Sequence, residues 1–431
     1  MRTYLSTISL LYLAFSLFPT NVFSQNAPPT VVAGIPVNYD EALVGSYTLP
    51  EPLILQNGNK VTDADSWLNK RRPEIIRLYE ENQFGKMPPA PADLSFDVFD
   101  KGTLVFNGTA IRKQVTIYFT KDTSSHKMEL LIYLPAKATK PSPLLLNFSF
   151  SANSNVVDDD GIKPGKTWSP DGKRIPAPKS NFGKLNIEQF ITEGIGIATL
   201  CYTDIEPDFK NGINFGIRSL YLKDGATQPK SNEWGAIASW SWGLSRAMDY
   251  LETDKNIDSK RIAVTGASRL GKTVLWAGAK DTRFAMVIAS ISGEGGAALS
   301  RRNYGETIKH ITDTSRYHYQ FAANYHNFSD RVNELPMDGH MLISLIAPRP
   351  LLLQTGNSDL WSDPRGEFLA AVAAEPVYNL FGLKGPGTTT MPETGDKRLL
   401  NPLGYYMHEG GHSVLPEDWK IFIEYMKKYL L

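Results

Sequence analysis

Five short runs of almost continuous apolar residues lie between residues 143 and 354. They cover residues 143–149, 194–200, 261–265, 286–290 and 350–354. Such runs are typical of strands buried on both faces of a parallel sheet. Segments 233–252 and 272–280, between these runs, have helical spacing. This alternation predicts an α/β fold: a doubly wound, mostly parallel sheet between two layers of helices, a three-layer αβα sandwich.

The chain before this region has a different pattern. Residues 103–106, 112–119 and 127–135 alternate between apolar and polar side chains and are separated by turn residues. We therefore expect antiparallel strands at the N-terminal side of the sheet. Helical spacing also occurs over residues 65–84, with Asp65 or Ser66 as N-cap, and over residues 416–430 at the end of the chain.

The first 24 residues have the composition of a secretory signal peptide. Arg2 precedes an apolar run over residues 5–18, and small residues precede Gln25. The run is too short for a transmembrane helix, and no similar run follows. We expect a secreted protein, periplasmic or extracellular.

The rest of the chain is expected to form one domain, residues 51–431, preceded by a linker or arm over residues 25–50. Polar segments 150–182 and 383–402 predict long surface loops.

The charge balance of the chain limits the classes of partner that it could bind. Lys plus Arg and Asp plus Glu both number 45, so no net charge favours nucleic acid or an anionic membrane. We expect a monomer that binds neither.

Cys201 is the only cysteine and excludes an internal disulfide. Its apolar surroundings predict a buried structural thiol.

Segment 264–273 follows a predicted strand and opens a helix. Its spacing Gly266-x4-Gly271-Lys272-Thr273 matches the P-loop. However, an exported chain leaves the ATP pool, and strand 286–290 lacks the terminal aspartate that Mg²⁺ needs. Residues 265–268 are also similar to the glycine turn of short-chain dehydrogenases, but the G-x-G-x-x-G pattern is incomplete. We therefore favour neither nucleotide-binding interpretation.

The same segment matches a nucleophile elbow, the tight turn that exposes a serine hydroxyl between a strand and a helix. Ser268 would be the nucleophile, and the N–H groups after it would face the oxyanion. Gly271 lies three residues after Ser268 instead of two, so the match to G-x-S-x-G is imperfect. The alternative is a serine that only caps the helix. A serine hydroxyl is a poor nucleophile near neutral pH, so this interpretation needs a base and an acid elsewhere in the chain.

The base is predicted near the C-terminus. His408, Glu409 and His412 formally match the zinc motif H-E-x-x-H, with Glu409 as base. Gly410 and Gly411 each cost about 1 kcal/mol inside a helix, so a loop is favoured over the helix that zinc ligation needs. A histidine in a loop before the last helix is where the α/β-hydrolase fold places its base, and we assign His412 to that role.

The acid is expected after strand 350–354, where a G-x-x-D turn contains Asp359. Asp359 is our choice and Asp363 the second, and either could cap a turn instead. The other histidines in this half of the chain lack such a context and are expected to be structural: His310, His318, His326 and His340.

Four segments together resemble the glucuronoyl esterases of carbohydrate esterase family 15, which have the α/β-hydrolase fold. They are the Gly-x-Ser-Arg-x-Gly-Lys turn of residues 266–272, the aromatic helix 234–243, the loop 292–298 and the segment around His412. The resemblance extends from about residue 50 to the end of the chain.

The resemblance implies further roles. Arg269 would contribute to the oxyanion hole, while Lys272, Glu306 and Trp361 would contact the sugar. One position departs from the family pattern: Ile291 stands before Ser292-Gly293, where many members carry a triad glutamate. Glu294 is displaced by three residues, which leaves the role of acid to Asp359.

By this resemblance the substrate is an ester between a (4-O-methyl)glucuronic acid branch of xylan and an alcohol of lignin. Ser268 would attack the ester carbonyl and form an acyl-enzyme, with no cofactor and no metal. Two alternatives stay open: an acetylxylan-type carbohydrate deacetylase with the same triad, and a non-catalytic sugar-binding relative.

Overall fold

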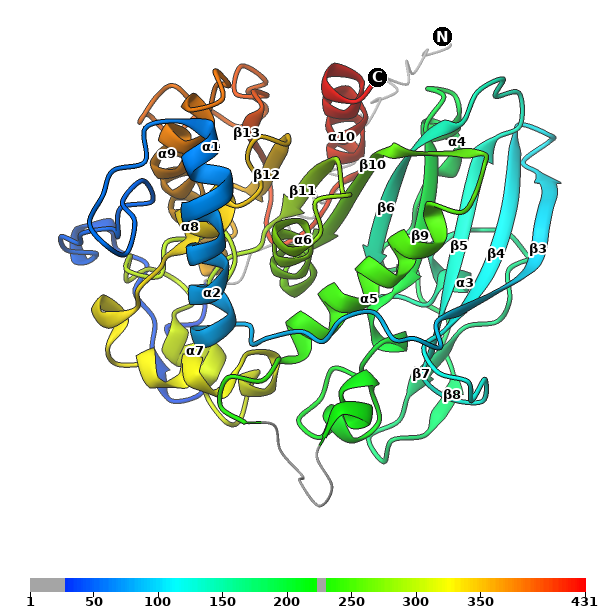
Figure 1. Cartoon of the computed structure of the whole chain (residues 1–431), viewed down its shortest axis with the longest axis horizontal. Coiled ribbons are helices and arrows are strands. Elements are labelled where there is room, and N and C mark those ends of the chain that lie inside the picture. Colours follow the sequence, from blue (N-terminus) through cyan, green and yellow to red (C-terminus); the bar gives the residue numbers. More distant parts are fainter. Residues whose placement is uncertain (1–27, 223–229) are drawn as a thin grey trace, which may run out of the picture.

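The computed structural model describes residues 28–222 and 230–431. The predicted signal peptide lies outside these ranges. The central sheet has nine strands (Figure 1). Their bounds are β3 Ser95–Val105, β4 Ala110–Tyr118, β5 Lys127–Pro135, β6 Ser142–Ser149, β9 Gly196–Cys201, β10 Ile257–Ala267, β11 Met286–Ser290, β12 Leu351–Gly356 and β13 Leu403–His408. Two small hairpins, β1 Val31–Val32 with β2 Ile35–Pro36 and β7 Lys166–Trp168 with β8 Arg174–Pro176, lie outside the sheet.

The sheet is mixed, with the strand order β13-β12-β11-β10-β6-β9-β5-β4-β3. The six strands from β13 to β9 are parallel, and β5, β4 and β3 continue the sheet in antiparallel pairing. The predicted parallel strands with antiparallel strands at the N-terminal side are therefore confirmed. All six parallel strands point their carboxyl ends to one edge, where α/β enzymes bind their ligands.

Helices cover both faces of the sheet. Their bounds are α1 Ala64–Ser66, α2 Arg72–Asn82, α3 Asn153–Val156, α4 Ile187–Ile191, α5 Ala236–Leu251, α6 Arg269–Lys280, α7 Ile308–Thr312, α8 Gly339–Ser344, α9 Pro364–Asn379 and α10 Pro416–Tyr429. One apolar cluster contains side chains of α2, α5, α6, α8 and α9, and a second contains side chains of α4 and α10. Alternate residues of β6 divide between the clusters: Leu144 and Leu146 pack in the first and Leu145 in the second. The expected three-layer sandwich is present.

The structure corrects some sequence predictions. The first helix begins earlier than expected, because the carboxylate of Asp63, not Asp65 or Ser66, caps it by accepting from the Ser66 N–H at 2.7 Å. A π-helical turn, Trp67–Arg71, joins α1 to α2. Segment 150–182 is less irregular than predicted and contains α3 and the β7–β8 hairpin.

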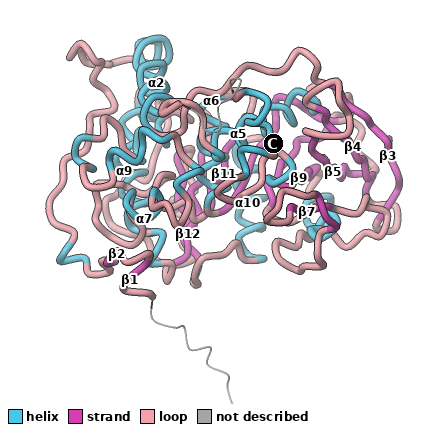
Figure 2. Tube along the Cα trace, turned by 90° about the horizontal axis from the view of Figure 1, so that it is seen from below, coloured by secondary structure: helices cyan, strands magenta, loops and turns pink. Residues whose placement is uncertain are grey.

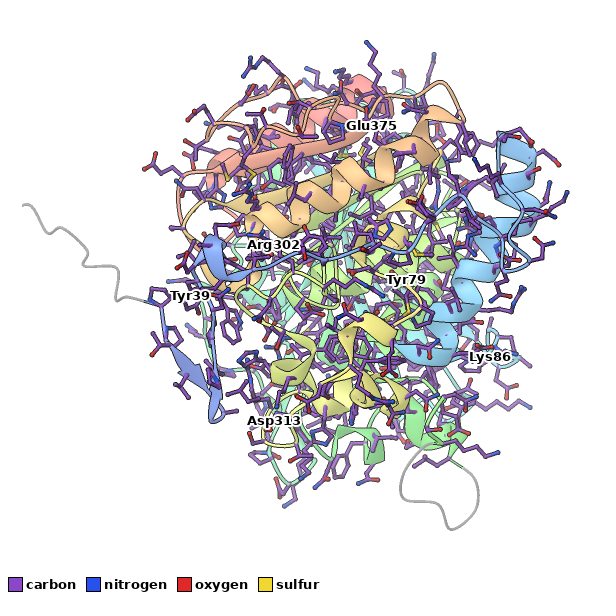
Figure 3. All side chains as sticks on the ribbon, turned by 90° about the vertical axis from the view of Figure 1, so that its left-hand side faces the viewer. Tyr39, Tyr79, Lys86, Arg302, Asp313 and Glu375 are labelled. Atoms are coloured by element: carbon purple, nitrogen blue, oxygen red, sulfur yellow. The ribbon has the colours of Figure 1, made fainter. Side chains whose placement is uncertain are left out.

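Residues 28–50 run along the surface, with β1 and β2 on the side opposite the antiparallel strands (Figure 2). The carbonyl of Asn38 accepts from the Gly305 N–H at 2.8 Å, and Glu41 pairs with Arg302. Figure 3 shows Tyr39 and Arg302 on the same side of the molecule. The segment thus contacts the rest of the chain as an arm would, while the proposed domain division stays a prediction.

Within residues 28–222 and 230–431, no helix has the length and apolarity needed to cross a bilayer. Cys201 is a buried free thiol, as expected, and burial raises its pKa to about 12.

Candidate active site

Ser268 occupies the turn between β10 and α6, at the carboxyl edge of the parallel strands. Its φ of 57° and ψ of −128° are sparsely populated for a residue with a side chain, as a sharp elbow requires. The turn is crowded: a Cβ on Gly266 would lie 2.7 Å from the Leu270 carbonyl oxygen, and one on Gly271 would lie 2.7 Å from the Ser290 carbonyl oxygen. Although Ser268 holds the N-cap position of α6, its hydroxyl makes no capping hydrogen bond. The simple capping alternative is therefore wrong.

His412 lies in the loop between β13 and α10. Its Nδ1 is 2.6 Å from Asp359 Oδ2 and 3.1 Å from Ser362 Oγ. Asp359 follows β12, whose carboxyl end neighbours that of β13. The strand order thus brings the two loops together, and the buried carboxylate fixes Nδ1 as the donor nitrogen.

Ser268 and His412, which are 144 positions apart in the sequence, line the same two cavities. The hydrogen bonds of the described residues do not include a direct one between these two side chains. Catalytic contacts of this kind often form only when substrate closes the site.

Asp363, the second acid considered, has other partners. Its carboxylate accepts from Arg302 Nε at 2.8 Å. It also accepts from the Gly366 N–H at 2.9 Å, and this second hydrogen bond caps α9. Burial raises the pKa of Asp363 to about 6, despite the charge of Arg302. Of the two carboxylates, Asp359 is the one that contacts His412.

The position of the missing loop glutamate is filled by an apolar residue. Ile291 has a φ of 41° and lines both cavities. Glu294 is buried and points elsewhere, accepting from Ser300 Oγ at 2.6 Å and from the Tyr325 hydroxyl at 3.1 Å. Burial raises the pKa of Glu294 to about 8.

The H-E-x-x-H segment is not a helix, because His408 ends β13 and residues 409–415 form a loop. His408 Nδ1 is 2.8 Å from Asp418 Oδ2, and His408 Nε2 is 3.3 Å from the Gly411 carbonyl oxygen. The two histidines therefore face different carboxylates. Within the described ranges no three His, Cys, Asp or Glu side chains are grouped so that they could hold a metal ion.

The His408–Asp418 pair predicts a pH-dependent contribution to stability. Burial disfavours the imidazolium, but the hydrogen bond and charge of Asp418 outweigh it and raise the pKa of His408 above its ordinary 6.5. The stabilisation is therefore complete below the unfolded-state pKa and is lost as the pH rises through the folded-state pKa. Compared with wild type, His408→Gln should lose on the order of 1 kcal/mol of unfolding free energy near about pH 5.5, and less near about pH 9. Urea unfolding at both pH values measures this difference, and a larger loss at the higher pH would contradict it.

Two cavities of different character meet at Ser268, Ile291 and His412. The polar cavity has a volume of about 290 Å³ and is lined by Arg269, Lys272, Glu306, Arg316, Tyr317, Gln320 and Trp361, among others. The aromatic cavity has a volume of about 410 Å³ and is lined by Phe148, Phe150, Phe182, Val414 and Trp419, among others. A group bound at Ser268 could therefore place one substituent in the polar cavity and another in the aromatic cavity.

The polar cavity contains all four residues for which the family resemblance implied a role. Lys272 Nζ is 3.9 Å from Glu306 Oε2, too far for a hydrogen bond, and burial lowers the pKa of Lys272. The Arg269 guanidinium pairs with Asp208 and lies 4.6 Å from the centre of the Tyr317 ring. Glu306 N–H donates to the Trp361 carbonyl at 2.8 Å, which joins the two segments.

Three residues that line the polar cavity were missed by the sequence analysis. Arg316, Tyr317 and Gln320 come from a segment of short turns between α7 and α8. Arg316 Nη2 is 3.2 Å from Glu306 Oε1, and its guanidinium lies 5.1 Å from the Trp361 ring centre. A cluster of aromatic and cationic residues over 316–319 is the only hint in the sequence, and it has no fixed spacing.

Known proteins are similar to this chain in sequence and in architecture. A sequence model of fungal glucuronyl esterases matches residues 225–382. A carbohydrate esterase of an unknown prokaryotic organism is 44% identical over 402 residues, covering 91% of this chain and 92% of the relative. The solved glucuronoyl esterase of Solibacter usitatus has a TM-score of 0.85 and 44% identity, covering 90% of this chain and 99% of that one.

A further solved structure is a promiscuous CE15 esterase from the marine bacterial metagenome, with a TM-score of 0.82 and 42% identity over 91% of this chain and all of its own. The expected fold and family are thus confirmed. The chain belongs to the glucuronoyl esterases of carbohydrate esterase family 15 and is a carboxylic ester hydrolase.

Proposed function

We propose that this chain is a secreted esterase that cleaves esters of (4-O-methyl)glucuronic acid, as in lignin–glucuronoxylan cross-links, with Ser268, His412 and Asp359 as its triad. The observation that carries the proposal is the 2.6 Å contact between His412 Nδ1 and Asp359 Oδ2, in a wall that also contains Ser268. Export is supported by the signal-like composition of residues 1–24.

The first half of the reaction acylates the enzyme. Ser268 Oγ attacks the C6 carbonyl carbon of the uronate ester while His412 Nε2 takes the hydroxyl proton. Asp359 holds the imidazole through Nδ1 and stabilises its charged form. Arg269 and nearby backbone N–H groups bind the oxyanion. The bond to the alcohol oxygen then breaks, and the alcohol leaves with the proton from His412.

The second half releases the acid. Water gives a proton to His412 as its oxygen attacks the acyl carbon, and the bond to Ser268 Oγ breaks as that proton returns to the serine. The products are the free uronic acid and the unmodified enzyme. Every step uses groups of the chain, the ester and one water molecule.

The two cavities suggest how the ester lies. We assign the sugar acid to the polar cavity, because Lys272 and Glu306 can donate to and accept from ring hydroxyls, and Trp361 adds an indole beside them. We assign the alcohol to the aromatic cavity, whose phenyl and indole rings fit a lignin-type aromatic alcohol.

Phe182 tests the assignment of the alcohol. It is 65% exposed at the aromatic cavity, and its ring lies 5.9 Å from that of Phe150, edge to face. An aromatic contact contributes about 1 kcal/mol, so Phe182→Ala should lower kcat/KM for the benzyl ester of glucuronic acid about fivefold and leave the methyl ester nearly unchanged. Phe99→Ala, which removes another exposed ring, is the matched control and should leave both values unchanged. Equal losses on the two esters would argue against this placement.

The choice of substrate class needs one comparison. Rates on methyl and benzyl glucuronate should greatly exceed those on acetylated xylan. Faster release of acetate would instead favour the deacetylase alternative. Binding of glucuronate without turnover of any ester would favour the non-catalytic one.

A further inference from the structure

Asp208 accepts hydrogen bonds from four side chains on three separate segments. Its Oδ2 accepts from the Tyr202 hydroxyl at 2.9 Å and from Arg269 Nη1. Its Oδ1 accepts from the Tyr319 hydroxyl and from Gln320 Nε2, both at 2.8 Å. The side chain is only 6% exposed. A carboxylate has about four lone-pair sites, so each of its sites is used.

These four donors come from segments that end at the carboxyl edge of the parallel strands or line the polar cavity. Arg269 follows Ser268 in the elbow, and Gln320 lines the same polar cavity. Tyr202 follows β9, whose carboxyl end lies on the edge that carries the site. The carboxylate therefore joins the elbow, the end of β9 and the turn segment that forms one wall of the polar cavity.

We propose that Asp208 is a positioning residue for the esterase reaction, because it holds the Arg269 guanidinium where the oxyanion develops. This inference rests on the proposed function, in which Arg269 stabilises that oxyanion.

The geometry of the guanidinium favours a positioning role. Nη1 donates to Asp208, and the central carbon of the guanidinium lies over the Tyr317 ring, 4.6 Å from its centre. A guanidinium has five N–H donors, so one fixed nitrogen leaves others for the substrate. An oxyanion hole works only when its donors are already placed at 2.7–3.1 Å from the developing charge. A long side chain such as arginine needs an anchor to meet that condition.

Asp208→Asn tests the proposal by weakening the anchor while keeping the shape of the side chain. Loss of an oxyanion donor costs about 10²- to 10³-fold in kcat, and its displacement should cost part of that, about 10- to 100-fold, with KM for benzyl glucuronate within about threefold of wild type. In an Arg269→Ala background the same substitution should have no further effect on kcat, because its target is gone.

Asp159→Asn is the matched control. Asp159 also accepts from an arginine and a tyrosine, Arg112 Nη1 at 2.6 Å and the Tyr133 hydroxyl at 2.8 Å, and it lines neither cavity. Its replacement should leave kcat unchanged. If Asp208→Asn does not fold, Asp208→Glu keeps the charge, shifts the guanidinium and should show the same selective loss of kcat.

The proposal is overturned if folded Asp208→Asn keeps its wild-type kcat, or if it loses kcat equally with and without Arg269, as a general structural defect would. Failure of the proposed function is a separate result, because wild-type protein would then not turn over the uronate ester at all.

Discussion

Replacing Ser268 by alanine should abolish hydrolysis of benzyl glucuronate, lowering kcat by about 10⁵-fold or more. The Ser268 hydroxyl is the only protein group in our mechanism that bonds to the acyl carbon, so its loss removes the covalent route. The residual rate would come from binding and from the oxyanion donors. The measurement is kcat by release of benzyl alcohol.

Ser290→Ala is the control for this variant. Ser290 ends the neighbouring strand β11, and its hydroxyl is buried without a hydrogen-bond partner among the described residues. The Ser290→Ala variant keeps the backbone carbonyl of residue 290, which accepts from the Ser268 N–H at 2.9 Å. The kcat of Ser290→Ala should stay within about threefold of wild type, a barrier change of about 0.7 kcal/mol or less, because the Ser290 hydroxyl contacts no group of the proposed triad. Normal turnover by Ser268→Ala would remove Ser268 from the mechanism.

Asp359→Asn should lower kcat by about 10³- to 10⁴-fold while the protein stays folded. Asp359 Oδ2 accepts from His412 Nδ1 and so leaves Nε2 free to take a proton from Ser268. An amide in this place can donate to Nδ1 and hold the wrong tautomer. The KM should change little, because Asp359 orients the base and does not bind the sugar.

Asp363→Asn separates the two candidate acids. Its carboxylate caps α9 and pairs with Arg302, so its loss should cost about 1–4 kcal/mol of unfolding free energy. The kcat of the folded protein should stay within about threefold of wild type, a barrier change of about 0.7 kcal/mol or less, because the helix cap does not contact the reacting atoms. Thermal unfolding and kcat should be measured on both Asp359→Asn and Asp363→Asn. We expect the first variant to lose kcat and the second to lose stability. The reverse pattern, with kcat lost in Asp363→Asn alone, would transfer the acid to Asp363.

Much of the sheet could be predicted because its strands are buried on both faces. The run around Leu144–Leu146 is apolar without interruption, and such runs have few other structures open to them. Strand β13 was not predicted, because its apolar pattern is interrupted by Gly404, Tyr405, Tyr406 and His408. The Tyr405 hydroxyl finds buried partners in Thr355 and the Pro364 carbonyl, which only tertiary structure reveals.

The site was predictable where its geometry depends on one short segment. The elbow at Ser268 and the loop at His412 each have local glycine patterns, and a buried strand leads to Asp359. The choice between Asp359 and Asp363 needed three-dimensional contacts, since both follow the same strand. Their catalytic roles stay predictions.

Residues without a local pattern could not be found in advance. Asp208, Arg316 and Gln320 lie in irregular segments or a single short 3-10 turn, and the fold alone brings Arg316 and Gln320 to the cavity wall and Asp208 into contact with Gln320. Asp63 was missed as a cap because Asp65 and Ser66 also suit that role and stand closer to the first apolar residue.

The most direct test of the central claim is active-site titration with a fluorophosphonate, followed by peptide mass spectrometry and an assay on benzyl glucuronate. We predict one equivalent of label on Ser268 and loss of uronate esterase activity in proportion to labelling. Full activity in protein whose Ser268 is completely labelled would contradict the mechanism.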